Sequence, residues 1–149
     1  MSVEIPIYFE NKKCVEFEIE GKPFGKQRPR VINRGGFSTT YTPKQTVDYE
    51  NKVKKSYKNT VGNTKLNNAI RTEIIGIFPI PKNTSKKMKS LMLKNQIKHT
   101  KKIDCDNMAK TVLDALNNIA YNDDSQICEL YIKKRYGENP KVKVKLEEI

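Results

Sequence analysis

The apolar side chains of residues Asp106–Ile119 fall on one common face only if the segment forms a helix. At about 100° per residue, the apolar side chains fall between roughly 180° and 340° on a helical wheel, and the polar ones between roughly 0° and 80°. The pattern predicts an amphipathic helix with one face in a core and a chemically active face opposite. The apolar set is Met108, Ala109, Val112, Leu113, Ala115, Leu116, Ile119 and Ala120, and the polar set is Asp106, Lys110, Asp114 and Asn117.

Strands are predicted where apolar and polar residues alternate or where β-branched residues cluster. Arg71–Ile80 has the composition of a central strand and ends in prolines, which cannot continue a ladder. The 149 residues predict one small α+β domain over 1–149, with helices packed on a mixed β-sheet and residues 1–14 unassigned. The other expected elements are strands at Val15–Glu20 and Phe37–Tyr41, a cationic loop at Gly21–Arg30, helices after Pro43 and at Thr84–Asn95, and a C-terminal β-hairpin of Ser125–Tyr136 and Lys141–Ile149 around Gly137–Pro140.

The chain carries a large surplus of positive charge. Lys and Arg total 29 against 17 Asp and Glu, which gives a formal net charge of +12. Such a field attracts polyanions, so nucleic acid is the first partner to consider and an anionic membrane surface the second. No apolar run reaches the roughly 18–20 residues of a spanning helix, and the acidic start differs from a signal peptide. We therefore expect a soluble, cytoplasmic protein with no membrane partner.

Several enzyme classes are disfavoured by residue types that are scarce. Cys14, Cys105 and Cys128 are far apart and form no CxxC pair, which argues against structural zinc and a disulfide framework. His99 is the single histidine, so histidine-based zinc hydrolysis and a Ser–His or Cys–His device are also disfavoured. There is no Walker A or dinucleotide glycine pattern, and no organic cofactor is expected. Catalysis here would rely on carboxylates, lysines and arginines.

A basic segment leads directly into a pair of carboxylates. Residues Lys82–Lys102 contain eight lysines and no Asp or Glu, and Asp104 and Asp106 follow at once. Carboxylates repel a DNA backbone unless a divalent cation sits between them. Mg²⁺ prefers carboxylate oxygens and water and can bridge them to a phosphate, so the pattern suggests metal-assisted phosphodiester hydrolysis.

Each of these residues also has a structural explanation when it is taken alone. Asp106 is a possible helix cap, Lys110 and Asp114 are spaced as an i,i+4 ion pair, and Asp123–Asp124 is a possible polar turn. The case for a site rests on their combination.

The segment Asp104–Ile127, DCDNMAKTVLDALNNIAYNDDSQI, resembles the signature of the RusA family of Holliday-junction resolvases. GKPFGKQRPR near the start, YTPK at Tyr41–Lys44 and the lysine-rich stretch before the motif extend the resemblance over most of the chain. It implies a small homodimeric crossover junction endodeoxyribonuclease of DNA recombination and repair. Such an enzyme uses Mg²⁺, with Mn²⁺ as a substitute, to resolve four-way DNA by paired symmetric nicks.

The resemblance also implies roles for individual residues. Asp104, Asp106 and Asp124 correspond to the metal-binding carboxylates, with Asp124 preferred to Asp123, and Lys110 to the essential lysine near the scissile phosphate. Asp114 and Asn117 match positions that orient Lys110 or brace the turn. We expect these basic residues to hold the DNA arms: Lys26, Arg28, Arg30, Lys86, Lys87, Lys89, Lys101 and Lys102.

Aromatic side chains offer a second way to contact open bases near a branch point. Phe24, Phe37, Tyr41 and Tyr121 are the candidates, although core packing is the favoured role for each.

Two other classes of function stay open. A non-catalytic basic DNA- or RNA-binding protein would use the carboxylates only for caps and turns. A nuclease for flaps, forks or RNA would keep the metal and change the substrate. A membrane-surface protein is disfavoured because no segment combines a basic face with large apolar residues.

Overall fold

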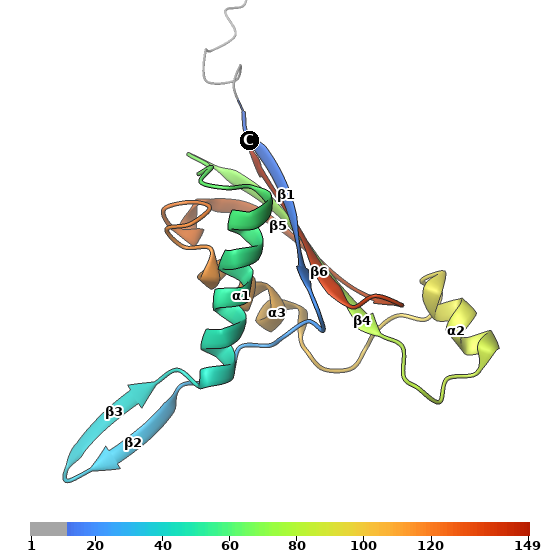
Figure 1. The fold of residues 1–149 in the computed structure, drawn as a ribbon, viewed down its shortest axis with the longest axis horizontal. Coiled ribbons are helices and arrows are strands. Elements are labelled where there is room, and N and C mark those ends of the chain that lie inside the picture. The colour runs from blue at the N-terminus through green and yellow to red at the C-terminus, as the bar shows by residue number, and fades with distance from the viewer. Residues whose placement is uncertain (1–11) are drawn as a thin grey trace, which may run out of the picture.

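The computed structural model describes residues 12–149. In Figure 1, helices α1 and α3 lie beside a twisted sheet, α2 lies near one end of the sheet, and a separate two-stranded hairpin projects beyond α1. The segment of residues 1–14, for which the sequence predicts no element, lies almost wholly outside the described residues. Cys14 is already the first residue of a strand.

The main sheet is mixed and has four strands in the order β1-β6-β4-β5. Strand β4 is parallel to β5 and antiparallel to β6, and β6 is antiparallel to β1. The predicted α+β class with a mixed sheet is confirmed. The strand bounds are β1 Cys14–Glu20, β4 Ile70–Pro79, β5 Ile127–Gly137 and β6 Lys141–Glu148.

The two C-terminal strands follow each other through a short turn, as predicted, but they do not pair with each other. Strand β4 lies between β5 and β6 and hydrogen-bonds to both. The physical reason lies in β4, where every second residue from Ile70 to Phe78 is buried, including the large apolar Ile70, Ile74 and Phe78. A strand this apolar is most stable in the centre of a sheet, and this position separates β5 from β6.

One face of the sheet is covered by helix α1 (Lys44–Thr60) and helix α3 (Cys105–Ala115). The predicted apolar face of α3 is confirmed, with Met108 and Val112 fully buried in the core. Helix α3 ends at Ala115 rather than Ile119, because Asn118 adopts a φ of +64° that a right-handed helix cannot contain. None of the helices in residues 12–149 has the length and apolar character needed to cross a membrane.

The hairpin consists of β2 (Arg30–Arg34) and β3 (Phe37–Tyr41), and all ten of its strand residues are exposed. The sequence predicted β3 but assigned no strand to β2. A usable signal was present in Gly35–Gly36, because both glycines have positive φ, as a tight hairpin turn requires. Helix α2 (Lys86–Leu93) is the predicted lysine-rich helix, and Ser85 caps it by accepting a hydrogen bond from the Met88 N–H.

Candidate active site

The polar face of α3 is in place, and its charged groups contact one another. Lys110 Nζ lies 3.6 Å from Asp114 Oδ2, one helical turn away. The Lys110 side chain is 65% exposed, whereas that of Asp114 is only 19% exposed. Asp114 is therefore part of the protein framework, and the Lys110 ammonium faces solvent, where a phosphate could reach it.

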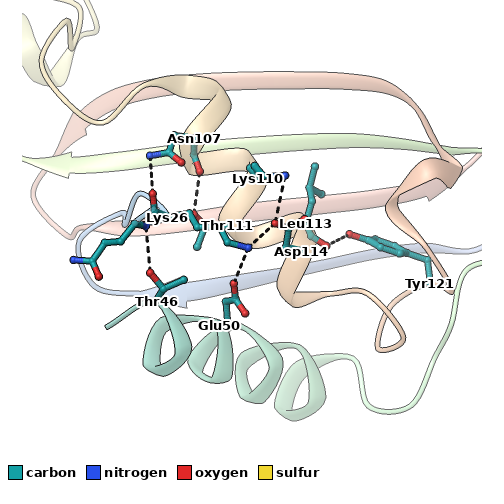
Figure 2. Close-up of polar contacts among 10 residues, drawn as sticks. Lys26, Thr46, Glu50, Asn107, Lys110, Thr111, Leu113, Asp114 and Tyr121 are labelled. Carbon is teal, nitrogen blue, oxygen red and sulfur yellow. Dashed lines mark hydrogen bonds and ion pairs between the residues drawn. The ribbon is translucent and has the colours of Figure 1, made fainter. Parts of the chain in front are cut away.

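A second lysine reaches Asp114 from the first loop. Lys26 Nζ lies 2.8 Å from Asp114 Oδ2 and 3.4 Å from Glu50 Oε1 on α1, as Figure 2 shows. The hydrogen bond to Asp114 raises the pKa of Lys26 above its ordinary value, so the ammonium stays charged. In the structure, Lys26 joins the first loop to α1 and α3. The DNA contact that the sequence suggests for Lys26 stays a prediction.

Further contacts hold the first loop between the two helices. The Lys26 carbonyl accepts a hydrogen bond from Asn107 Nδ2 at 3.3 Å, and the Gln27 N–H donates to the buried Thr46 hydroxyl at 3.2 Å (Figure 2). Gly25 has no room for a side chain, because a Cβ there would collide with Ile103 and lie 2.8 Å from Asn107 Nδ2. The loop is thus seated against the residues that precede and begin α3.

The paired carboxylates after α3 have different surroundings. Asp123 caps the short 3₁₀ helix Asp124–Gln126 by accepting a hydrogen bond from the Ser125 N–H. Hydrogen bonding with Ser125, first with its side chain and then with its backbone N–H, lowers the pKa of Asp123. The pKa of Asp124 is instead raised, first by burial and then by the nearby charges of Asp123 and Asp114, while Lys110 acts in the opposite direction. Asp123 is occupied as a cap, and the Asp124 carboxylate lies among like charges that a cation would neutralise.

Two residues fasten this turn to α3. The Asn117 side-chain oxygen accepts a hydrogen bond from the Asp124 N–H at 2.9 Å, which is the bracing contact expected of it. The hydroxyl of the buried Tyr121 donates to the Leu113 carbonyl at 2.6 Å, and burial raises its pKa (Figure 2). Tyr121 is therefore a packing residue, and it is not available to stack on DNA.

Asp104 and Asp106 occupy the N-terminal end of α3, and both are exposed. Asp104 is the N-cap residue, yet its side chain makes no cap hydrogen bond. It borders an open cleft between the first loop and the residues before α3, with Phe24, Ile103 and Asn107 among its lining residues. The carboxylate is thus free to bind a ligand that enters the cleft.

The three proposed metal ligands do not meet in one cluster. Among residues 12–149, no three His, Cys, Asp or Glu side chains form a group that could hold a metal ion. Asp106 and Asp114 are eight residues apart, which corresponds to about 12 Å along a helix axis, and Asp124 is beside Asp114. The donor chemistry fits Mg²⁺, since all three are carboxylates, but the ligands are spread along α3.

Lys134 on β5 is a residue of the site that the sequence did not indicate. Its ammonium donates to the carbonyl oxygens of Lys101 at 2.6 Å and Ile103 at 2.7 Å, and it lies 5.6 Å from the centre of the Phe78 ring. These bonds fix the backbone immediately before Asp104. No sequence pattern pointed to Lys134, because its partners are main-chain atoms about 30 residues away.

The other predicted DNA-binding residues are found in three places. Arg28 and Arg30 lie at the base of the hairpin, and Lys101 and Lys102 lie just before Asp104, all exposed. Lys86, Lys87 and Lys89 belong to α2 at the far end of the sheet, where Lys89 lies 3.7 Å from Glu138 (Figure 1). Phe24 stacks on Tyr49 with ring centres 5.1 Å apart, whereas Phe37 and Tyr41 are exposed.

Comparison with known proteins finds related sequences over most of the chain. The sequence profile of the family described as "Endodeoxyribonuclease RusA" matches residues 20–147. The chain is also 32% identical over 138 residues to an uncharacterized protein of Bacillus subtilis (strain 168), YqaN, with 91% of this chain and 97% of the relative covered. The matched region contains both the α3 face and the first loop.

Proposed function

Because the chain belongs to the RusA endodeoxyribonuclease family, we propose that it is a Mg²⁺-dependent nuclease that resolves Holliday junctions by paired, symmetric nicks in DNA recombination and repair. The observation that carries the proposal is the polar face of α3, where an exposed lysine lies between carboxylates within the matched region. A nuclease that acts on such DNA would work in the cytoplasm.

Asp104, Asp106 and Asp124 would hold the metal, and Mn²⁺ would substitute for Mg²⁺. When bound, the metal would polarise the scissile phosphate and supply a water molecule of lowered pKa. Asp104 makes no cap hydrogen bond, and Asp124 has a raised pKa among like charges, so both have unused capacity for a cation. Since the ligands lie apart, we expect tight metal binding only together with DNA.

Lys110 would neutralise the charge that develops on the phosphate oxygens. Its position suits this role, because the ammonium faces solvent and lies 3.6 Å from Asp114, which can orient it. Asp114 is itself held by Lys26. This arrangement leaves Asp114 to orient Lys110 rather than to bind metal.

A homodimer would match the symmetry of the substrate. A four-way junction presents two equivalent strands to be cut, and one protomer supplies one α3 face. A two-fold dimer would place one site at each strand.

The test is cleavage of a synthetic four-way junction in Mg²⁺, with linear duplex as substrate control and Asp106→Asn as enzyme control. We expect paired nicks in the junction alone, and a loss of at least a hundredfold in rate with Asp106→Asn. Tight junction binding without nicks, in Mg²⁺ and in Mn²⁺, would favour the non-catalytic DNA-binding alternative. Preferred cutting of flaps or forks would retain the nuclease and change its substrate.

A further inference from the structure

The β2–β3 hairpin is only two strands wide, yet it exposes large apolar side chains to solvent. Phe37 is 78% exposed, Val31 60% and Tyr41 42%. A two-stranded ribbon without a third strand or a covering helix is only marginally stable in water. Large exposed apolar groups gathered on one projection mark a surface that meets a partner.

The register of the hairpin divides its side chains into two unlike faces. Paired residues in a ladder point to the same side, and the side alternates along each strand. Arg30 pairs with Tyr41, and Arg34 pairs with Phe37. One face therefore carries Arg30, Ile32, Arg34, Phe37, Thr39 and Tyr41, and the other carries Val31, Asn33, Ser38 and Thr40.

The first of these faces combines both arginines with both aromatic rings, a combination that fits nucleic acid. Aromatic rings stack on bases, while guanidinium groups bind phosphates. The surroundings agree with this assignment, because no Asp or Glu occurs between Gly21 and Val47. A two-fold contact between copies through this face would bring Arg30 and Arg34 of both chains together with no nearby carboxylate in this segment to neutralise them, so nucleic acid is the better partner.

The position of Phe37 favours a branch point over a continuous duplex. It follows the Gly35–Gly36 turn directly, so its ring is at the tip of the ribbon. An apolar side chain that inserts into DNA must unstack a base step, and this costs least free energy where stacking is already broken.

The hairpin is also tied to the candidate active site at both ends. Its first strand follows the loop that Lys26 and Asn107 hold against α3. Its second strand leads through Pro43 into α1, where Thr46 accepts the hydrogen bond from Gln27. In Figure 1 the hairpin extends from this loop end of α1 away from the sheet. It can thus reach DNA whose phosphate lies near α3.

We propose that the β2–β3 hairpin is a DNA-contacting arm, in which Phe37 stacks on bases at a branch point and Arg30 and Arg34 bind the adjoining phosphates. The inference rests on the proposed function for its substrate, but not on metal binding or on cleavage.

The experiment places the fluorescent base 2-aminopurine at the branch point of a four-way junction, or at the same sequence in a linear duplex. Each DNA is titrated with full-length Asp106→Asn protein, which should bind without cutting. Fluorescence reports unstacking, and the same titration gives the dissociation constant. Phe37→Ala is compared with Tyr131→Ala, an exposed tyrosine on β5, and with Val31→Ala on the opposite face of the hairpin.

We expect the parent protein and both control variants to raise the fluorescence of the junction. Phe37→Ala should lose this rise and bind the junction about tenfold more weakly, with unchanged affinity for linear duplex. The double change Arg30→Gln and Arg34→Gln should weaken binding to both DNAs and reduce the slope of log Kd against log salt by about 1.8.

The outcomes separate the two proposals. If Phe37→Ala and Tyr131→Ala behave alike while wild-type protein cuts junctions, the arm is refuted and the nuclease stands. If Phe37→Ala weakens junction and duplex binding equally, or changes the oligomeric state instead of DNA binding, the branch-point role is refuted. If wild-type protein neither binds nor cuts any DNA, the proposed function itself fails.

Discussion

Lys134 Nζ donates a 2.7 Å hydrogen bond to the carbonyl oxygen of Ile103, the residue directly before Asp104. A strand residue thereby sets the position at which α3 begins. We expect any effect of this contact on catalysis to pass through the backbone, which would make Lys134 a positioning residue rather than a catalytic one.

Replacing Lys134 by Met should lower the rate of junction cleavage on the order of tenfold to a hundredfold, because Asp104 loses its fixed backbone. Junction affinity should change much less. Cleavage rates at saturating enzyme, together with binding in the absence of metal, separate the two effects. Lys133→Met is the matched control, since Lys133 is the neighbouring residue on β5, is exposed and pairs with Glu73 at 3.9 Å. Equal losses in both variants would contradict the positioning role.

Replacing Asp123 and Asp124 one at a time should separate effects on stability from effects on activity. Asp124→Asn should reduce cleavage at least a hundredfold but leave the Tm unchanged or higher, because it removes a charge that burial, Asp123 and Asp114 disfavour. Asp123→Ala should lower the Tm, because the cap of the 3₁₀ helix is lost, and it should keep more of the activity.

The pH dependence follows from the direction of the Asp124 shift. The pKa of Asp124 is higher in the folded state than in the unfolded state. Wild-type protein therefore loses stability as the pH rises from the unfolded-state pKa through the folded-state pKa, and the Asp124→Asn variant does not. The Tm difference between them should therefore be largest near neutral pH and vanish in acid. A difference of the opposite sign would show that Asp124 is stabilised in the fold.

Lys26→Gln tests whether this lysine binds DNA or organises the site. Its removal leaves Asp114 without its 2.8 Å partner and the buried Glu50 oxygen without a counter-charge, so the Tm should fall. The salt dependence of junction binding should stay unchanged, whereas the loss of one phosphate contact would reduce the slope by about 0.9. Lys22→Gln, exposed in the same loop, is the control for a general loss of charge.

His99 should make the protein less stable in mild acid. Its ring stacks on Phe78 with centres 3.9 Å apart, and burial, followed by the charge of Lys134, lowers its pKa below the ordinary value. The unfolded chain then binds a proton that the folded chain does not, so stability falls as the pH drops through about 6.5 and towards the folded pKa. Because it is the single histidine, one NMR titration measures its pKa directly.

The Tm between pH 8 and pH 5.5 should decrease more for wild-type protein than for His99→Phe, which retains a ring but cannot titrate. A folded-state pKa above 6.5, or equal pH profiles for the two proteins, would contradict this expectation.

The parts of the fold that follow from local sequence were predictable, and those that depend on distant partners were not. The α3 face was predictable because Met108 and Val112 repeat with the helical period and are both buried. The end of α3 was not, since Asn118 leaves the helix through a positive φ without a glycine or proline to mark it. The central place of β4 was predictable from its apolar, β-branched composition, but the identity of its two neighbours, β5 and β6, was not, because alternation alone does not determine which strands pair.

The candidate site shows the same division. The types and order of Asp104, Asp106, Lys110 and Asp124 were visible along the chain. The difference between Asp123 and Asp124 arises only from the turn, where the Ser125 N–H bonds to one and not to the other. The role of Lys26 depends on Glu50, a residue on another helix.

The central place of β4 has a consequence for synthesis of the protein. The strand is complete at residue 79, yet it pairs with β5, which begins at Ile127, and with β6, which begins at Lys141. Pairings this distant in sequence form late and slowly. A nascent chain released before β6 (Lys141–Glu148) has been synthesised therefore lacks the complete sheet on which α3 packs. Such a fragment is expected to lack a packed α3 and therefore to show none of the nuclease activity proposed for the whole chain.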